Sequence, residues 1–154
     1  MSKATIMVVG LAVLFAVSGL SSQSATATKD SRELVKLPAM MQEHMLANMR
    51  DHLVALDEML AALAEGKTDE AAEVAEKRLG MSSLSLHGAA HMGKFMPKEM
   101  GAIGTQMHRA ASRFVVVARD AELEPGLNSQ RKVYKALQEI TENCNACHLG
   151  YRIR

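Results

Sequence analysis

Apolar residues recur every three or four positions through most of the chain beyond residue 37, which is the spacing of one face of an α-helix. The first such run predicts a helix from about Pro38, or slightly earlier, to Glu65, with Gly66 as its C-terminal cap. Its inward stripe is expected to consist of Met41, Met45, Met49, His52, Leu56, Met59 and Leu63, widened by Leu46, Leu53 and Leu60.

The second apolar run is shorter and is followed by an irregular stretch. This run predicts a helix that begins at Thr68 and ends at Leu79, before Gly80. Two acidic residues follow Thr68 in the first turn, where the helix dipole favours negative charge. Serines, glycines and a proline interrupt the stretch 81–100, which leaves room for a short helix over 87–95.

Two long helices complete the predicted set. One should run from residue 97 or 98 to about 122, and the other starts at Asn128 or Ser129 after the Pro125–Gly126 break. Four amphipathic helices with short links predict an all-α fold, an antiparallel four-helix bundle. The buried face of the third helix should comprise Ile103, Met107, Ala110, Ala111, Phe114, Val117 and Ala118, and that of the fourth Val133, Leu137, Ile140, Cys144 and Cys147.

The first 27 residues have the pattern of a secretory signal peptide. Lys3 precedes an uncharged apolar run from Ala4 to Leu20, and Ala25-Thr26-Ala27 matches the A-x-A pattern of a cleavage site. The alternative is an uncleaved membrane anchor, for which the run is short against the roughly 20 residues that a bilayer needs. We expect cleavage after Ala27, export to the periplasm, and a mature domain over residues 28–154 with no membrane span.

Composition narrows the classes of partner. The chain has no Trp and only 3% aromatic residues, while good helix formers dominate, so the core should consist mainly of Ala and Met. The formal net charge is +1, and it falls to 0 when the segment that carries Lys3 is removed. Without a strong basic field, nucleic acid is not an expected partner.

The strongest chemical signal is Cys144-Asn145-Ala146-Cys147-His148, which has the C-x-x-C-H form of a c-type haem attachment site. In such a site two thiols form thioethers with one porphyrin, and the histidine binds the iron. A disulfide, a thioredoxin-like dithiol and half of a zinc site are the alternatives. A zinc site needs a second ligand pair, which the spacing does not offer, and a redox dithiol belongs at the start of a helix. Export also suits haem attachment, which occurs outside the cytoplasm.

The chain resembles the class II c-type cytochromes, the cytochrome c′ family, through its length, helical layout and the form C-x-x-C-H-x-x-Y-R from Cys144 to Arg152. The resemblance implies a periplasmic four-helix bundle, often a homodimer, with one haem c held covalently by Cys144 and Cys147 on the last helix. It implies that His148 is the proximal iron ligand and that Arg152 lies near it. Tyr151 is expected to pack against the haem edge.

The residue opposite His148 decides the function. In class II relatives it comes from the first helix: a methionine gives low-spin iron suited to electron transfer, and an apolar residue gives five-coordinate iron that binds NO or CO. The register puts Met45 or Leu46 near the iron, and the inward stripe favours Met45 as a tentative distal ligand. The other candidates, in order of preference, are Met49, Met41 and His44. The alternative is that all these methionines only fill gaps in the core.

The histidines and methionines suggest a second metal as a further hypothesis. His87 and His91 are spaced i, i+4, and imidazole with thioether ligands suits copper. The alternative is that these residues belong to the core or cap an irregular loop. Further candidates are Met92, Met96, Met100, Met107 and His108, and the patch His44, Met45, Met49 and His52.

The sequence therefore predicts an electron carrier that cycles haem iron between Fe(II) and Fe(III) with redox partner proteins, and not an enzyme. No G-x-S-x-G nucleophile motif occurs, and His44 is the obvious candidate for a peroxidase-type distal group. A gas-binding haem protein and a copper-handling haem protein are the alternative functions. An Ala-rich first helix with exposed leucines permits a homodimer.

Overall fold

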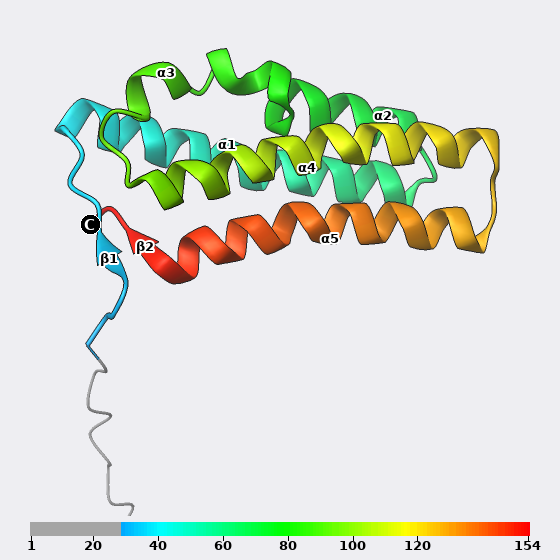
Figure 1. Ribbon diagram of the computed structural model, residues 1–154. Coiled ribbons are helices and arrows are strands. Elements are labelled where there is room, and N and C mark those ends of the chain that lie inside the picture. Colours follow the sequence, from blue (N-terminus) through cyan, green and yellow to red (C-terminus); the bar gives the residue numbers. More distant parts are fainter. Residues whose placement is uncertain (1–28) are drawn as a thin grey trace, which may run out of the picture. The chain divides into compact units, whose positions relative to one another are not determined.

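The structure is a computed structural model that describes residues 29–154. Helices dominate it, and this confirms the predicted all-α class (Figure 1). The predicted signal peptide over residues 1–27 lies outside the described residues. The elements are β1 (Glu33–Leu34), α1 (Ala39–Ala64), α2 (Thr68–Val74), the π-helical turn η1 (Ala75–Leu79), the 3-10 turn η2 (Met81–Ser85), α3 (Ala89–Met92), α4 (Lys98–Leu123), α5 (Leu127–Gly150) and β2 (Tyr151–Arg152).

The end of α1 confirms the predicted glycine cap. Gly66 has φ +75°, in the left-handed region that glycine adopts without steric cost. Its N–H donates to the Leu63 carbonyl at 3.1 Å, and the Lys67 N–H donates to the Ala62 carbonyl at 2.8 Å. These two bonds form a Schellman motif, which satisfies carbonyls at the helix end. The chain reverses here, and α2 begins at Thr68 as predicted.

The core lies where α2, the C-terminal half of α1, the middle of α4 and the first half of α5 meet. α4 packs along α5 and against α2 and η1, and α1 packs against α2 and η1. Phe114 is the largest fully buried side chain among the described residues. Small side chains fill most other core positions, so the helices approach closely, as the composition predicts. They are Ala55, Ala62, Ala71, Ala72, Ala75, Ala110, Ala111, Ala118 and Ala136.

The predicted buried faces of α4 and α5 are confirmed at most positions, but that of α1 is partly wrong. Leu53 and Leu60, expected to widen the inward stripe, are 66% and 50% exposed. The buried positions are instead Ala55 and Ala62, each two residues after one of these leucines. Apolar spacing alone does not distinguish a small inward residue from a large outward one, so the predicted stripe is wider than the observed buried face.

The irregular stretch is less helical than predicted. Of the expected short helix over 87–95, only α3 forms, because Gly88 takes φ +61° and interrupts the helical path before it. The start of α5 at Leu127 precedes the expected caps by one or two residues, within the usual uncertainty of a helix boundary.

A polar contact fastens η2 to α4. The Ser112 hydroxyl accepts the Met81 N–H at 2.9 Å and donates to Glu76 Oε2 at 2.7 Å, while the Ser82 N–H donates to Glu76 Oε1 at 3.2 Å. We expect Ser112→Ala to lower the free energy of unfolding by about 1–2 kcal/mol, because the Met81 N–H and the Glu76 carboxylate each lose a hydrogen bond. Urea unfolding measures this, with Ser85→Ala at an exposed position of η2 as the control.

The same contact predicts a pH dependence. Partial burial opposes ionisation of Glu76, but the hydrogen bonds donated by Ser112 and Ser82 outweigh it and lower the pKa of this carboxyl below its ordinary 4.5. A lowered carboxyl pKa stabilises the fold above the ordinary value, and this stability is lost as pH falls through the folded value. The loss of stability on acidification should therefore be smaller in Ser112→Ala than in the unmodified protein. An equal loss in both would contradict the assigned role.

Two short strands join the start and end of residues 31–154. β1 pairs with β2 in parallel, with Glu33 opposite Tyr151, and the Val35 N–H donates to the Arg152 carbonyl at 2.8 Å. Val35 is buried. The pairing places the start of α1 and the end of α5 at the same end of the molecule (Figure 1).

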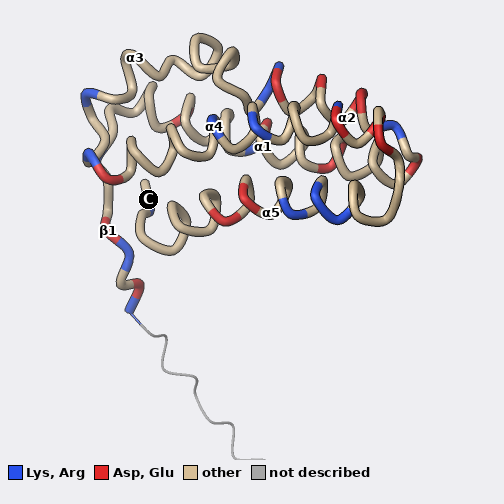
Figure 2. The backbone as a smooth tube through the Cα atoms, turned by 45° about the vertical axis from the view of Figure 1, so that its right-hand side comes forward, with Lys and Arg blue, Asp and Glu red and all other residues tan. Residues whose placement is uncertain are grey.

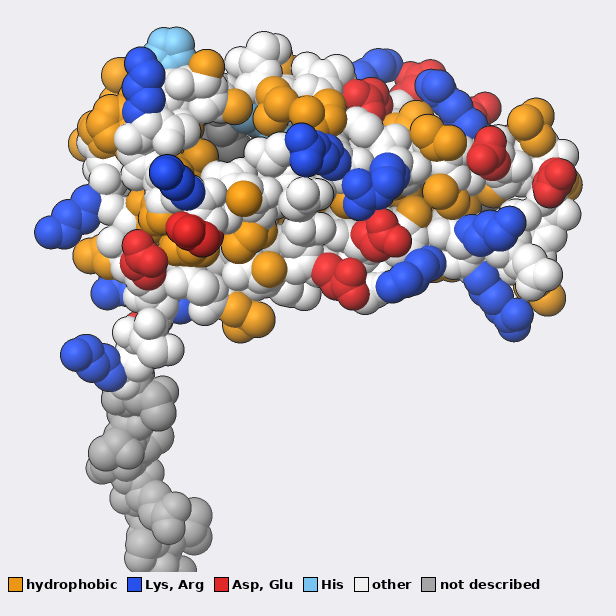
Figure 3. Space-filling view, viewed as in Figure 1, with side chains coloured by type: hydrophobic (Ala, Val, Ile, Leu, Met, Phe, Trp, Pro, Cys, Tyr) orange, Lys and Arg blue, Asp and Glu red, His pale blue; other side chains and the backbone are white. Residues whose placement is uncertain are grey.

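Charge is unevenly spread along the helices. Figure 2 shows many acidic and basic residues along α2 and the first half of α5, whereas residues 143–151 at the end of α5 carry none. Figure 3 shows both signs interspersed on one face. Among the described helices, none is both long and apolar enough to cross a bilayer.

Candidate functional site

The last two turns of α5 place the C-x-x-C-H residues on one helix face. At 100° per residue, Cys147 and His148 lie about 60° and 40° to either side of Cys144. Ile140, one turn earlier on this face, is fully buried, and Cys144 packs against the core as a partly buried side chain. Cys147 is also partly buried, and His148 is exposed. The predicted inward direction of both cysteines is therefore supported by their burial.

The two thiols are free, and their environment does not favour thiolates. Burial raises the pKa of Cys144 and of Cys147, and the neighbouring Cys147 raises that of Cys144 further. Both lie near the C-terminus of α5, where the helix dipole disfavours negative charge. A thioredoxin-like dithiol needs the opposite, a lowered thiol pKa at a helix N-terminus. This site is therefore poorly suited to dithiol redox chemistry.

Residues before α1 and in its first turn form hydrogen bonds with His148 of the motif and with the segment that follows it. The Gln42 side-chain amide donates to the Ile153 carbonyl, and the Arg32 guanidinium donates to the His148 carbonyl at 3.4 Å. Arg152 and Tyr151 are half-buried in β2. The sequence alone did not predict this fastening, since two-residue strands leave no periodic pattern.

The burial pattern of α1 distinguishes Met45 from Leu46. Both side chains are partly buried. Met45 precedes the buried His52 and Met59 by seven and fourteen residues, so it shares their inward stripe, since seven residues make nearly two turns. Leu46 stands in the same relation to Leu53 and Leu60, which are exposed. The helix therefore turns Met45 inward more than Leu46.

The apolar side chains at this end of the molecule are less buried than those of the core. Val35 and Met100 are buried at this end, but the continuous buried faces of α4 and α5 lie further from β1 and β2, at Met107 and beyond on α4 and up to Ile140 on α5. Apolar surface left partly in water is what a large apolar group would cover favourably. The residues concerned are Met41, Met45, Leu46, Met49, Ile103, Cys144 and Cys147.

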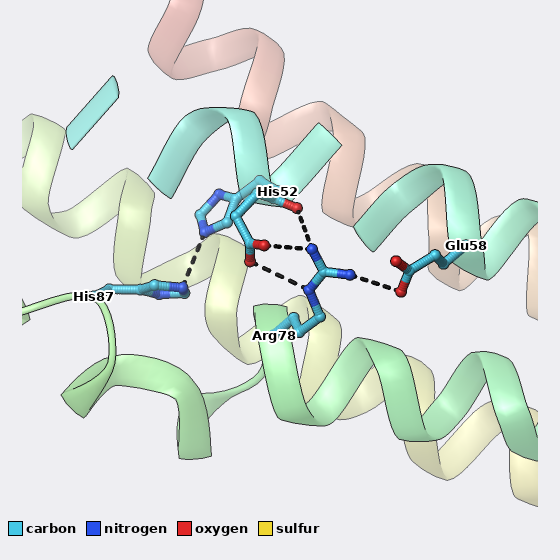
Figure 4. Close-up of polar contacts among 5 residues, drawn as sticks. His52, Glu58, Arg78 and His87 are labelled. Atoms are coloured by element: carbon cyan, nitrogen blue, oxygen red, sulfur yellow. Dashed lines mark hydrogen bonds and ion pairs between the residues drawn. The ribbon is translucent and has the colours of Figure 1, made fainter. Parts of the chain in front are cut away.

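The histidines are arranged differently from the predicted i, i+4 pair. His87 and His91 do not share a helix, because left-handed Gly88 lies between them and His91 is exposed in α3. His87 instead meets His52 of α1, with their Nε2 atoms 3.4 Å apart (Figure 4), and His108 of α4. Within residues 29–154, no three His, Cys, Asp or Glu side chains are arranged to hold a metal ion as they stand.

A surface depression at the α4–α5 turn does not coincide with any of these groups. It has a volume of about 240 Å³ and is lined by residues that include Val117, Leu123 and Lys132. Its lining contains no histidine or cysteine, so we assign it no chemical role.

Comparisons with protein-family models, with curated proteins and with solved structures found no match to this chain.

Proposed function

We propose that the chain is a periplasmic class II c-type cytochrome that carries one covalent haem c and exchanges electrons with redox partner proteins. The observation that carries the proposal is the C-x-x-C-H sequence on the inward face of the last helix. There Cys144 packs against the core while His148 follows on the same face. Export to the periplasm rests on the signal-peptide pattern of the first 27 residues.

The arrangement of the helices supports an antiparallel four-helix bundle as the host. α1, α2 with η1, α4 and α5 are four successive helical segments, and neighbours along the chain pack on one another. The links after α1 and α4 are short, which favours antiparallel neighbours. Bundles of this kind build cofactor sites from side chains on facing helices, and here the first turn of α1 contacts the segment after α5 through the hydrogen bond from Gln42 to Ile153.

The donor set fits haem c. Cys144 and Cys147 supply two sulfurs three positions apart, and the exposed imidazole of His148 supplies a nitrogen ligand from the next position. Met45 would supply a thioether from α1. Arg152 follows His148 by four residues, so its guanidinium would lie near the proximal side of the haem. When bound, haem supplies a one-electron Fe(III)/Fe(II) couple, and a thioether ligand raises its reduction potential.

The surface around the motif suits contact with a partner. Residues 143–151 carry no charge, and Leu149 is 78% exposed. An electron carrier brings its cofactor close to that of its partner, and a surface without charges can be covered by the partner without burying an unpaired charge. No substrate pocket or acid–base pair is required for this function.

An optical spectrum of the purified protein, oxidised and reduced, with and without CO, tests the proposal. Electron transfer with Met45 as ligand predicts a low-spin spectrum in both oxidation states, unchanged by CO. A high-spin spectrum with CO binding to the reduced protein would instead support gas binding, with partly buried Leu46 as the apolar neighbour. A protein without haem absorbance would overturn both.

A further inference from the structure

Three histidines from distant segments meet beside α1. The ring centroids of His52 and His87 are 4.7 Å apart, those of His87 and His108 5.2 Å, and those of His52 and His108 6.0 Å. In a tetrahedral site with metal–nitrogen bonds of 2.0–2.1 Å, the nitrogens are about 3.4 Å apart and the ring centroids about 5 Å apart. The three centroids bracket that spacing, and His52 Nε2 lies 3.4 Å from His87 Nε2.

Hydrogen bonds prepare two of the rings as ligands. His108 Nδ1 lies 2.7 Å from the Leu79 carbonyl oxygen, which can only accept, so Nδ1 carries the proton and Nε2 keeps its lone pair. The Ser83 hydroxyl donates to the Gly80 carbonyl at 2.7 Å, so its oxygen accepts from His87 Nδ1 at 3.5 Å. His87 Nε2 is then also unprotonated. Such second contacts are how proteins orient histidine ligands.

The three imidazoles are neutral, so they need not lose a proton before they bind a metal ion. Burial lowers the pKa of all three histidines, that of His52 to about 4, so the rings are neutral at pH 7. Arg78 donates to Asp51 and Glu58 (Figure 4), and its hydrogen bond lowers the pKa of Asp51, which stays ionised next to His52. Asp51 therefore places a carboxylate beside His52, and the charge of Arg78 partly offsets it.

We propose that His52, His87 and His108 form a three-imidazole site for a divalent transition metal ion, Zn²⁺ or Cu²⁺, separate from the haem motif. Imidazole nitrogens suit both ions. As placed, only His52 Nε2 and His87 Nε2 stand at ligand spacing, so binding requires a small shift of the three segments that keeps the Nδ1 contacts of His87 and His108. The Asn48 side-chain amide, which donates to the His87 carbonyl at 3.2 Å, holds the loop during that change.

Metal titration of the purified holoprotein tests the site. Cys144 and Cys147 are bonded to haem in the holoprotein, any haem-free chain is alkylated so that its thiols cannot bind the ion, and resident metal is removed with EDTA. Zn²⁺ is then titrated against a chromophoric chelator in the unmodified protein and in H52A, H87A and H108A. H91A is the matched control, because His91 is exposed and lies four residues from His87. Circular dichroism verifies the fold of each variant.

The site predicts one saturable equivalent of Zn²⁺, a loss of affinity of more than about 100-fold in each of the three variants, and no change in H91A. The absence of a saturable equivalent in the unmodified protein would overturn the proposal, as would retained binding in a folded variant. If a variant does not fold, Cu²⁺ bound to the unmodified protein decides. Its electron paramagnetic resonance spectrum should show three nitrogen ligands, and fewer would overturn the proposal.

Discussion

The C144A/C147A double variant is expected to carry no covalent haem and to melt about 10 °C below the haem-loaded protein. Covering three half-buried large side chains near the motif, such as Met45, Met49 and Ile103, gains about half the ~1.5–3 kcal/mol of full burial for each. The sum is about 3 kcal/mol, and a domain of this size shifts by several degrees per kcal/mol. Circular dichroism melts of both proteins measure the difference.

The matched control changes the opposite face of the same turns. Asn145 and Leu149 are exposed on α5, and N145A/L149A should retain haem and its melting temperature. If the cysteine variant melts at the same temperature as the haem-loaded protein, the cofactor does not complete the core. The proposed role of the partly buried residues would then be wrong.

Met45→Ala is expected to convert a low-spin ferric spectrum to high-spin, because the thioether ligand is lost. The reduction potential should fall on the order of 100 mV, a modest part of the roughly 0.8 V range that axial ligands set. Leu46→Ala is the control one residue away, and it should leave the spin state unchanged, since its stripe continues into exposed Leu53 and Leu60. Optical spectra and redox titration of both variants measure these effects.

The opposite pattern would reassign the residue at the sixth position. If Leu46→Ala alters the spectrum and Met45→Ala does not, the register of α1 differs by one residue from the one that places Met45 opposite His148. A high-spin spectrum in the unmodified protein would end the case for methionine ligation.

Local signals predicted most of the fold. The start of α2, the end of α1 and the bounds of α4 follow from periodicity and from residues such as Thr68 and Gly66, whose effect is confined to one turn. The inward face of α1 was predicted less well, because Leu53 and Leu60 share the apolar spacing but lie outside the core. Only packing against α2 and η1 decides which face turns inward.

Tertiary contacts account for what the sequence did not predict. The attachment motif is a run of five residues and could be found directly. By contrast, His52 and His87 are 35 positions apart and meet only because α1 and the loop after η2 pack together. The β1–β2 pairing likewise joins residues more than 100 positions apart. Neither contact leaves a signal in local spacing. The i, i+4 spacing therefore indicates His91 as the partner of His87, although the structure places His52 there.

Mass spectrometry of the protein, matured in an exporting host with haem attachment machinery, determines whether haem is bound covalently. The chain beginning at residue 28 is expected to carry the added mass of one haem, held by the peptide that contains Cys144 and Cys147. A mature chain with the mass of the polypeptide alone would show that this protein is not a c-type cytochrome.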